Sequence, residues 1–300
     1  MAVGTSPGTV NTVFVPAAAL FAVAIWGATA VATRITGGVM DPFLVGLLRT
    51  IVAGLFTAPA ILLLRMAPPA GNDGKLLVFL SGFGGFVGFP ILFSIGQAQT
   101  TAIHGGLILA CLPIYVGLYM AILDRRWPGQ RWCLGAAIAI GGEILLVAGK
   151  SADSGSDASL DGDLLIFAAA AFSALGYVAG ALLSQRGYSS KSTTAWGVTI
   201  SGILLIPLLP LADATLRGAP EVAVGGVLFL ALGSTIIAYV AWYWALGRGG
   251  IARTALFQFL QPVFATGFAV WLLAEGVDIV TFAAAIMILA GVVVARTGRQ

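Results

Sequence analysis

Ten continuous apolar runs decide what this chain can fold into. They cover residues 14–33, 43–64, 76–97, 101–123, 132–149, 163–184, 194–212, 222–246, 251–274 and 278–296. One helical crossing of a bilayer takes about 20 apolar residues, and a β-barrel would need alternating rather than continuous patterns. With 59% hydrophobic and 9% charged residues, the composition also lies outside the range of soluble domains. We therefore expect an all-α integral membrane protein with ten transmembrane helices.

The polar stretch from Lys150 to Asp163 divides these runs into two sets of five. Its Gly, Ser and Asp residues bury too little apolar area to offset their ordering entropy, which indicates a solvated linker. An ungapped shift of 149 residues aligns five helix-shaping pairs: Gly27 with Gly176, Gly84 with Gly233, Pro113 with Pro262, Gly142 with Gly291, and Gly149 with Gly298. We predict a tandem duplication, with one repeat over 1–149, a linker over 150–162 and a second repeat over 163–300.

An odd number of helices in each repeat has a geometric consequence. The second repeat must enter the membrane from the opposite face, so we expect two inverted five-helix repeats, an architecture that secondary transporters use. Basic residues fix the orientation. Eleven would lie on one side: Arg65, Lys75, Arg125, Arg126, Arg131, Arg186, Lys191, Arg248, Arg253, Arg296 and Arg299. Only Arg34, Lys150 and Arg217 would lie on the other. This asymmetry predicts cytoplasmic termini and a periplasmic linker, with the first run retained in the mature protein.

Two charges fall inside the predicted spans at similar depth. Arg49 lies in the second span and Glu143 in the fifth. Because a lone intramembrane charge is costly, we predict an ion pair between them, either a clamp between helices or a gating or proton-coupling pair. Arg49 alone, reaching outward to the interface, is the alternative. His104, the only histidine, begins the fourth span, and we expect it to be a water-exposed helix-end residue rather than a proton carrier.

Prolines and amides mark the middle of two corresponding spans. Pro113 and Pro262 each remove a backbone hydrogen bond, so we expect a kink or hinge in the fourth and ninth helices. Gln258 and Gln261 precede the second of these prolines, three residues apart and on neighbouring positions of one face. Amides in an apolar helix need partners, which another helix or a bound substrate would supply, and we predict that both amides bind the substrate.

Aromatic residues gather at comparable depth, and we predict that six of them line a substrate site: Trp26, Phe86, Phe89, Tyr115, Tyr177 and Tyr239. A tyrosine hydroxyl at mid-membrane depth needs a hydrogen bond, which a cavity provides. The two cysteines, Cys111 and Cys133, fit no disulfide framework and no metal spacing. We expect no metal and no cofactor, and the absence of a basic face with interleaved aromatics disfavours a nucleic-acid partner.

The chain resembles the ten-helix, EamA-type members of the drug/metabolite transporter superfamily over its whole length. The resemblance rests on Trp26-Gly27, Arg49, Pro113, the run from Leu260 through Glu275, and Gly291. Within the family it is most similar to aromatic amino-acid exporters of the YddG type. This resemblance implies an inner-membrane exporter whose cavity lies among helices one, three, four, six, eight and nine. One departure is that Arg126, rather than an acidic residue, occupies the position that corresponds to Glu275.

These observations predict a secondary exporter of small metabolites, with aromatic amino acids favoured, that works as a monomer by alternating access. Export of other amino acids or of amphipathic drugs is the nearest alternative. A channel would require a ring of repeated polar groups, which the sequence does not show. A membrane-embedded enzyme is disfavoured because there is one histidine, no metal-ligand cluster and no nucleophile–base spacing.

Overall fold

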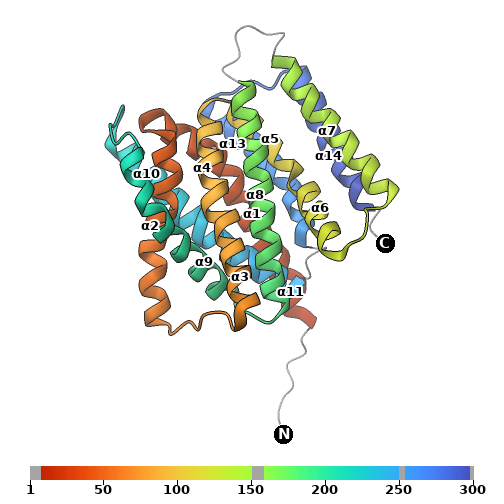
Figure 1. Ribbon diagram of the computed structural model, residues 1–300. Helices are drawn as coiled ribbons and strands as arrows, with labels where there is room; N and C mark the ends of the chain where they lie inside the picture. Colours follow the sequence, from red (N-terminus) through yellow and green to blue (C-terminus); the bar gives the residue numbers. More distant parts are fainter. Residues whose placement is uncertain (1–7, 151–158, 250–253, 298–300) are drawn as a thin grey trace.

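A computed structural model describes residues 8–150, 159–249 and 254–297, and within these ranges the chain is helical throughout apart from short connections (Figure 1). The elements form ten rods. The first repeat contains α1 (Gly8–Val39), α2 (Pro42–Leu63), α3–η1–α4 (Gly71–Gly82, Phe83–Gly88, Phe89–Ala98), α5–η2–α6 (Ala102–Ile108, Leu109–Cys111, Leu112–Asp124) and α7 (Gln130–Lys150). The second contains α8 (Leu160–Gln185), α9–η3 (Ser190–Leu205, Ile206–Leu211), α10–η4–α11 (Pro220–Leu228, Phe229–Ile237, Ala238–Gly249), η5–α13 (Ala255–Leu260, Gln261–Leu273) and α14 (Ile279–Thr297).

Each rod overlaps one of the ten predicted spans. Seven of the described helices are long and apolar enough to cross a membrane, and two shorter apolar helices, Gln261–Leu273 and Ile279–Ala295, accompany them. The outside of the bundle is rich in large apolar side chains, with Leu63 at 82% exposure and Ile279 at 83%. A water-soluble protein rarely exposes so much apolar surface. The fold is therefore that of an all-α integral membrane protein. Part of the predicted linker, residues 151–158, lies outside the described residues.

Four of the rods are interrupted by other helix types. The third and eighth contain π-helical turns, η1 and η4, whereas the fourth and ninth contain 3₁₀ turns, η2 and η5. Pro113 and Pro262 stand in the first turn of α6 and α13, directly after the 3₁₀ turns. Proline fits a helical first turn because the missing N–H has no intrahelical partner there. The two predicted proline positions therefore coincide with breaks between helical segments.

The same 149-residue register relates these irregularities. The segment α6 begins at Leu112 and α13 begins at Gln261, and each follows a 3₁₀ turn. Each then ends on a left-handed residue, Arg125 with φ 50° and Ala274 with φ 53°. The π turns η1 and η4 also overlap under this shift. Local backbone geometry thus repeats between the halves, although the two sequences differ at most positions.

Rods that correspond under the shift pack against one another, and two of these pairs lie away from the cavity. In one, α2 contacts α9, and a Cβ on Gly54 would lie 3.6 Å from the Cα of Gly202. In the other, α7 contacts α14 through small residues: a Cβ on Gly291 would lie 2.3 Å from the Ala139 nitrogen. Without a hydrophobic force between helices in lipid, such close backbone approach supplies the packing energy. Figure 1 shows the α7–α14 pair at one edge of the molecule and α2 at the opposite edge.

The connections sort onto two sides of the bundle in Figure 1. The beginning of α1 and the α2–α3 connection lie on the lower side, whereas the end of α7 and the beginning of α8 lie on the upper side. The predicted orientation assigns the lower side to the cytoplasm and the upper side to the periplasm.

Candidate functional site

A small cavity lies between six of the ten rods. Its walls are Trp26 and Thr29 of α1, Phe89 of α4, Leu109 of η2, Leu112 of α6, Ser173 and Tyr177 of α8, Tyr239 of α11, and Gln261 of α13. The resemblance implied a cavity among these same rods. The free space between the side chains is about the size of one water molecule, so the site is closed around its own side chains.

Aromatic rings make up much of the cavity wall. The Trp26 ring stacks on Tyr177 at 5.4 Å between centroids and meets the edge of Tyr239 at 5.1 Å. Behind them, Phe86 lies 4.6 Å from Tyr239, and Trp242 lies 5.4 Å from Trp26. Such edge and offset contacts suit the quadrupoles of aromatic rings, and a substrate ring would find the same complementary faces.

Hydroxyl and amide groups give the cavity its polar character. Thr29, Ser173, Tyr177 and Tyr239 contribute hydroxyls, and Gln261 contributes its amide. Gln261 is only 5% exposed and begins α13, where the break after η5 carries it to the cavity wall. Gln258 is equally buried on the preceding 3₁₀ turn, and its Nε2 has no hydrogen-bond partner. The predicted pair of amides is therefore split, with Gln261 on the wall and Gln258 outside it.

Arg49 lies next to the cavity and is 1% exposed. Its Nη2 donates to Ser234 Oγ at 3.0 Å and to Thr235 Oγ1 at 3.5 Å, and its guanidinium carbon lies 5.6 Å from the centroid of the Phe89 ring. The π turn η4 presents both hydroxyls, and π turns are frequent at functional sites. Arg49 therefore stays inside the bundle, which corrects the alternative that it reaches outward to the interface.

Three of the predicted substrate-binding residues, Phe86, Tyr115 and Gln258, do not line the cavity. The Tyr115 ring packs against Phe167 at 5.3 Å between centroids and contacts the cluster that contains Cys111 and Ile114. The side chain of Glu143 lies outside the described residues, so the predicted ion pair with Arg49 stays a prediction. Among the described residues, Arg49 contacts two hydroxyls and an aromatic ring, and Figure 1 places α7 and α2 at opposite edges of the molecule.

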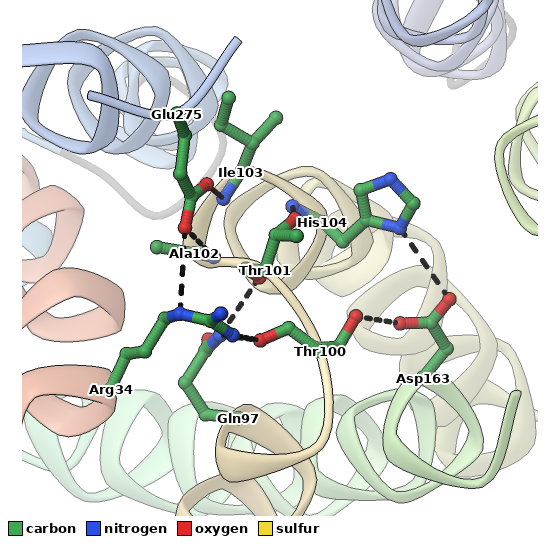
Figure 2. A network of polar contacts seen from close by, with 9 residues as sticks. All are labelled: Arg34, Gln97, Thr100, Thr101, Ala102, Ile103, His104, Asp163 and Glu275. Atoms are coloured by element: carbon green, nitrogen blue, oxygen red, sulfur yellow. Dashed lines mark hydrogen bonds and ion pairs between the residues drawn. The ribbon is translucent and has the colours of Figure 1, made fainter. Parts of the chain in front are cut away.

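A polar network joins the rods on the upper side of the bundle (Figure 2). We call it the end network, and its side chains are Arg34, Gln97, Thr100, Thr101, His104, Asp163 and Glu275. The Glu275 carboxylate accepts from the backbone N–H groups of Ala102 at 2.8 Å and Ile103 at 2.9 Å, at the beginning of α5. A carboxylate at this position also meets the favourable end of the helix dipole.

The other contacts of the end network extend it to α1 and α8. Arg34 Nε lies 3.7 Å from Glu275 Oε1, and Arg34 Nη1 donates to the Thr100 carbonyl. The Thr100 hydroxyl donates to Asp163 Oδ1 at 2.7 Å. The rods that this network joins, the first, third, fourth, sixth and ninth, also line the cavity. The network therefore closes the bundle at one end of the cavity.

His104 belongs to this network, which corrects the expectation that it faces water. It is 8% exposed, and its Nδ1 lies 3.6 Å from Asp163 Oδ2 (Figure 2). The reason is that α8 begins beside α5 and turns the Asp163 carboxylate toward the imidazole. Asp278, in the connection before α14, supplies a second negative charge near His104. The hydrogen bond from the Thr281 backbone N–H lowers the pKa of Asp278.

Fold and cavity together define a multi-pass helical membrane protein with an aromatic and polar pocket inside its bundle. The profile described as "EamA-like transporter family" matches residues 14–148 and again residues 160–297. The two matches cover most of the chain, so this protein belongs to the EamA-like transporter family. A solved crystal structure also aligns with a TM-score of 0.65 over 94% of this chain and 96% of that chain; at 21% identity this likeness shows the fold alone.

Curated relatives are named transporters. "Uncharacterized transporter YdeK" of Bacillus subtilis (strain 168) is 29% identical over 276 residues, covering 91% of this chain and 94% of that one. A Salmonella typhimurium protein named "Probable amino-acid metabolite efflux pump" is 27% identical and covers 91% of each chain. A Streptantibioticus cattleyicolor protein named "Probable terminal-alkyne amino-acid exporter" is 26% identical over 226 residues, covering 75% of this chain and 74% of that one.

Sequence reasoning missed several polar residues of this region. Thr29 lies three residues after Trp26, and Ser173 lies four residues before Tyr177, so both pairs share a helix face. Because Trp26 and Tyr177 were predicted to line the site, this helical spacing could have identified Thr29 and Ser173 as well. For Ser234 and Thr235 the signal was weaker: two hydroxyls directly after Gly233, in an otherwise apolar run.

Proposed function

We propose that this protein is a secondary exporter of small metabolites, with aromatic amino acids as its favoured substrates. The observation that carries the proposal is the cavity, in which the stacked rings of Trp26, Tyr177 and Tyr239 stand beside the Gln261 amide. Rings would hold the substrate side chain, and a side-chain amide both donates and accepts hydrogen bonds toward a polar backbone. Two relatives whose names refer to amino-acid export support the substrate class.

Alternating access is the mechanism we favour. Two features support it: the fourth and ninth rods each contain a 3₁₀ turn followed by a proline, and the end network joins cavity-lining rods on the upper side of the bundle. Breaking that network while the divided rods straighten or bend would open the cavity to the upper side. In the proposed orientation this side faces the periplasm of a bacterial inner membrane, and both termini lie in the cytoplasm.

Transport through a carrier is preferred over a channel or a membrane-embedded enzyme. A channel would use a ring of repeated polar groups, and the described residues of the cavity wall do not form one. No group of three or more His, Cys, Asp or Glu side chains suited to a metal ion occurs among the described residues. We expect a monomer in the lipid bilayer, with a small molecule as its partner and neither nucleic acid nor cofactor.

Counterflow in proteoliposomes tests this proposal. We expect purified protein to exchange labelled tryptophan against unlabelled tryptophan with saturable kinetics, and a second series with a pH gradient reports whether protons are coupled. Tyr239→Ala removes a ring contact, so it should slow the exchange of tryptophan more than that of threonine. A flux that rises linearly with concentration would contradict a carrier, and absence of tryptophan exchange would contradict the aromatic substrate.

A further inference from the structure

The Arg49 guanidinium is buried with only part of its hydrogen-bonding capacity used. It carries five N–H groups and a permanent charge. Only its Nη2 donates a hydrogen bond, while Nε and Nη1 are buried without a partner. Among the described residues it forms no ion pair with a carboxylate. Buried polar groups are nearly always hydrogen-bonded, and an uncompensated buried charge is costly. The unused N–H groups of Arg49 therefore indicate a binding position for an anionic hydrogen-bond acceptor.

Arg49 contacts residues of the cavity wall on two sides, directly through Phe89 and indirectly through Ser234. Its partner Ser234 shares a hydrogen bond of 2.9 Å with the Thr29 hydroxyl, and the Ser234 carbonyl accepts from Trp26 Nε1 at 3.1 Å. On the other side the guanidinium faces the Phe89 ring. Trp26, Thr29 and Phe89 all line the cavity, so one layer of side chains separates its free space from the charge. A modest displacement of Phe89 or Thr29, as the rods part, would bring a ligand to the unused N–H groups.

A cation, Arg49, lies beside the cavity, but no anionic side chain lines the cavity wall. Its nine wall residues include hydroxyls, an amide and aromatic rings, but no Asp or Glu. The described acidic side chains Asp163 and Glu275 are engaged in the end network instead. A zwitterionic substrate would therefore find a fixed cation for its carboxylate and only neutral groups for its ammonium. Guanidinium and carboxylate are geometrically matched, since two parallel N–H groups meet two oxygens.

We propose that Arg49 binds the carboxylate of the substrate, so that the site recognises aromatic monocarboxylates and does not require an α-amino group. This inference rests on the proposed function. It restricts the substrates to compounds with a carboxylate and extends them to compounds without an α-amino group. Desamino analogues of aromatic amino acids become substrates of the same site, and aromatic amines without a carboxylate are excluded. The cation that would bind the carboxylate lies directly behind the cavity wall.

Three indole compounds separate the contributions in the wild-type protein. Tryptophan has both charged groups, indole-3-propionate lacks the ammonium, and tryptamine lacks the carboxylate. Binding to purified protein in lipid nanodiscs should give similar dissociation constants for the first two compounds. Tryptamine should bind roughly 10- to 100-fold more weakly, the range expected when a hydrogen bond to a charged group is lost.

Variants then assign the effect to Arg49. Arg49→Gln should weaken binding of tryptophan and indole-3-propionate by a similar factor and leave tryptamine unchanged, whereas Arg49→Lys should keep part of the preference. Ser234→Ala is the matched control, because it removes a partner of Arg49 but retains the charge. If Arg49→Gln does not fold, Arg49→Lys takes its place: a reduced preference for the two carboxylates over tryptamine supports the role of Arg49, and an unchanged preference overturns it.

The outcomes distinguish this inference from the function on which it rests. Equal binding of tryptophan and tryptamine would overturn the role of Arg49 and leave the exporter proposal standing. Strong binding of tryptamine with none of indole-3-propionate would also overturn it, since the ammonium would then be the recognised group. Failure of all three compounds to bind would contradict the aromatic substrate itself, and the inference would fall with it.

Discussion

The side chains of Gln261 and Gln258 could either bind the substrate or only pack between helices, and their different surroundings predict different roles. Gln261 lies on the cavity wall, and Gln258 has a buried amide nitrogen without a partner. We expect Gln261→Ala to reduce tryptophan counterflow at least tenfold, and Gln258→Leu to reduce it less. Both variants should insert and purify normally, because neither removes a bond that holds two rods together. Wild-type rates from the double-alanine variant would show that these amides only pack.

Arg49 offers a second test at the residue scale. Its hydrogen bond to Ser234 predicts a coupling between Arg49→Ala and Ser234→Ala of about 1–2 kcal/mol in a double-mutant cycle on unfolding stability. The same cycle with Glu143→Ala tests the ion pair that the sequence predicted. Strictly additive losses for Arg49 and Ser234 would contradict the hydrogen bond between their side chains.

His104 illustrates what residue types alone do not reveal. A histidine at the beginning of an apolar helix is expected to face water, and the sequence offered no reason to choose otherwise. Its burial depends on Asp163, which lies 59 positions away in the chain and approaches only because α8 packs beside α5. Long-range pairing of polar groups is set by helix packing, whereas depth along a single helix can be predicted from the sequence.

Breaks within helices were partly predictable at the scale of elements. Pro113 and Pro262 predicted the breaks in the fourth and ninth rods, because proline has no N–H to donate to the helical hydrogen-bond pattern. The π turns of the third and eighth rods had no such signal. No residue type requires a π turn, and the one at η4 is accompanied by a bond from Thr235 Oγ1 to the Leu230 carbonyl that only the folded chain shows.

The contact between α7 and α14 carries a prediction at the same scale. A Cβ on Gly291 would lie 2.3 Å from the Ala139 nitrogen and 2.6 Å from the Gly135 carbonyl oxygen, so the helices must separate to accept it. We expect Gly291→Ala to lower the unfolding free energy by about 1–3 kcal/mol. Gly267→Ala in α13 is the matched control, because nothing lies within 4 Å of its added methyl group. Equal thermal stability of the two variants would contradict the close packing.

The predicted duplication was the most informative feature at the scale of the whole molecule. One shift of 149 residues, found from a few glycines and prolines, also relates the beginnings of α6 and α13 and their left-handed ends. The family profile likewise matches once in each half. The site was less predictable than the repeat. Five of the eight predicted substrate-binding residues line the cavity, but their polar neighbours and the end network required the packed structure.

Membrane orientation is a prediction that belongs to the whole chain. The asymmetry of Lys and Arg places residues 150–162 outside and both termini inside. Single cysteines introduced by Ser156→Cys and Thr297→Cys, with Cys111 and Cys133 replaced by serine, should react with an impermeant thiol reagent from opposite faces of the membrane. Reaction of both from outside would contradict the orientation and the inverted arrangement of the repeats.

The central claim is that one cavity opens alternately to the two sides, and the accessibility of Ser173 tests it most directly. Ser173 lines the cavity, and Ser173→Cys changes one atom. In the background without native cysteines and in membranes of defined orientation, the introduced thiol should react with an impermeant reagent added to either face. Tryptophan should slow both reactions. Reaction from a single face under every condition, with no protection by tryptophan, would contradict alternating access through this cavity.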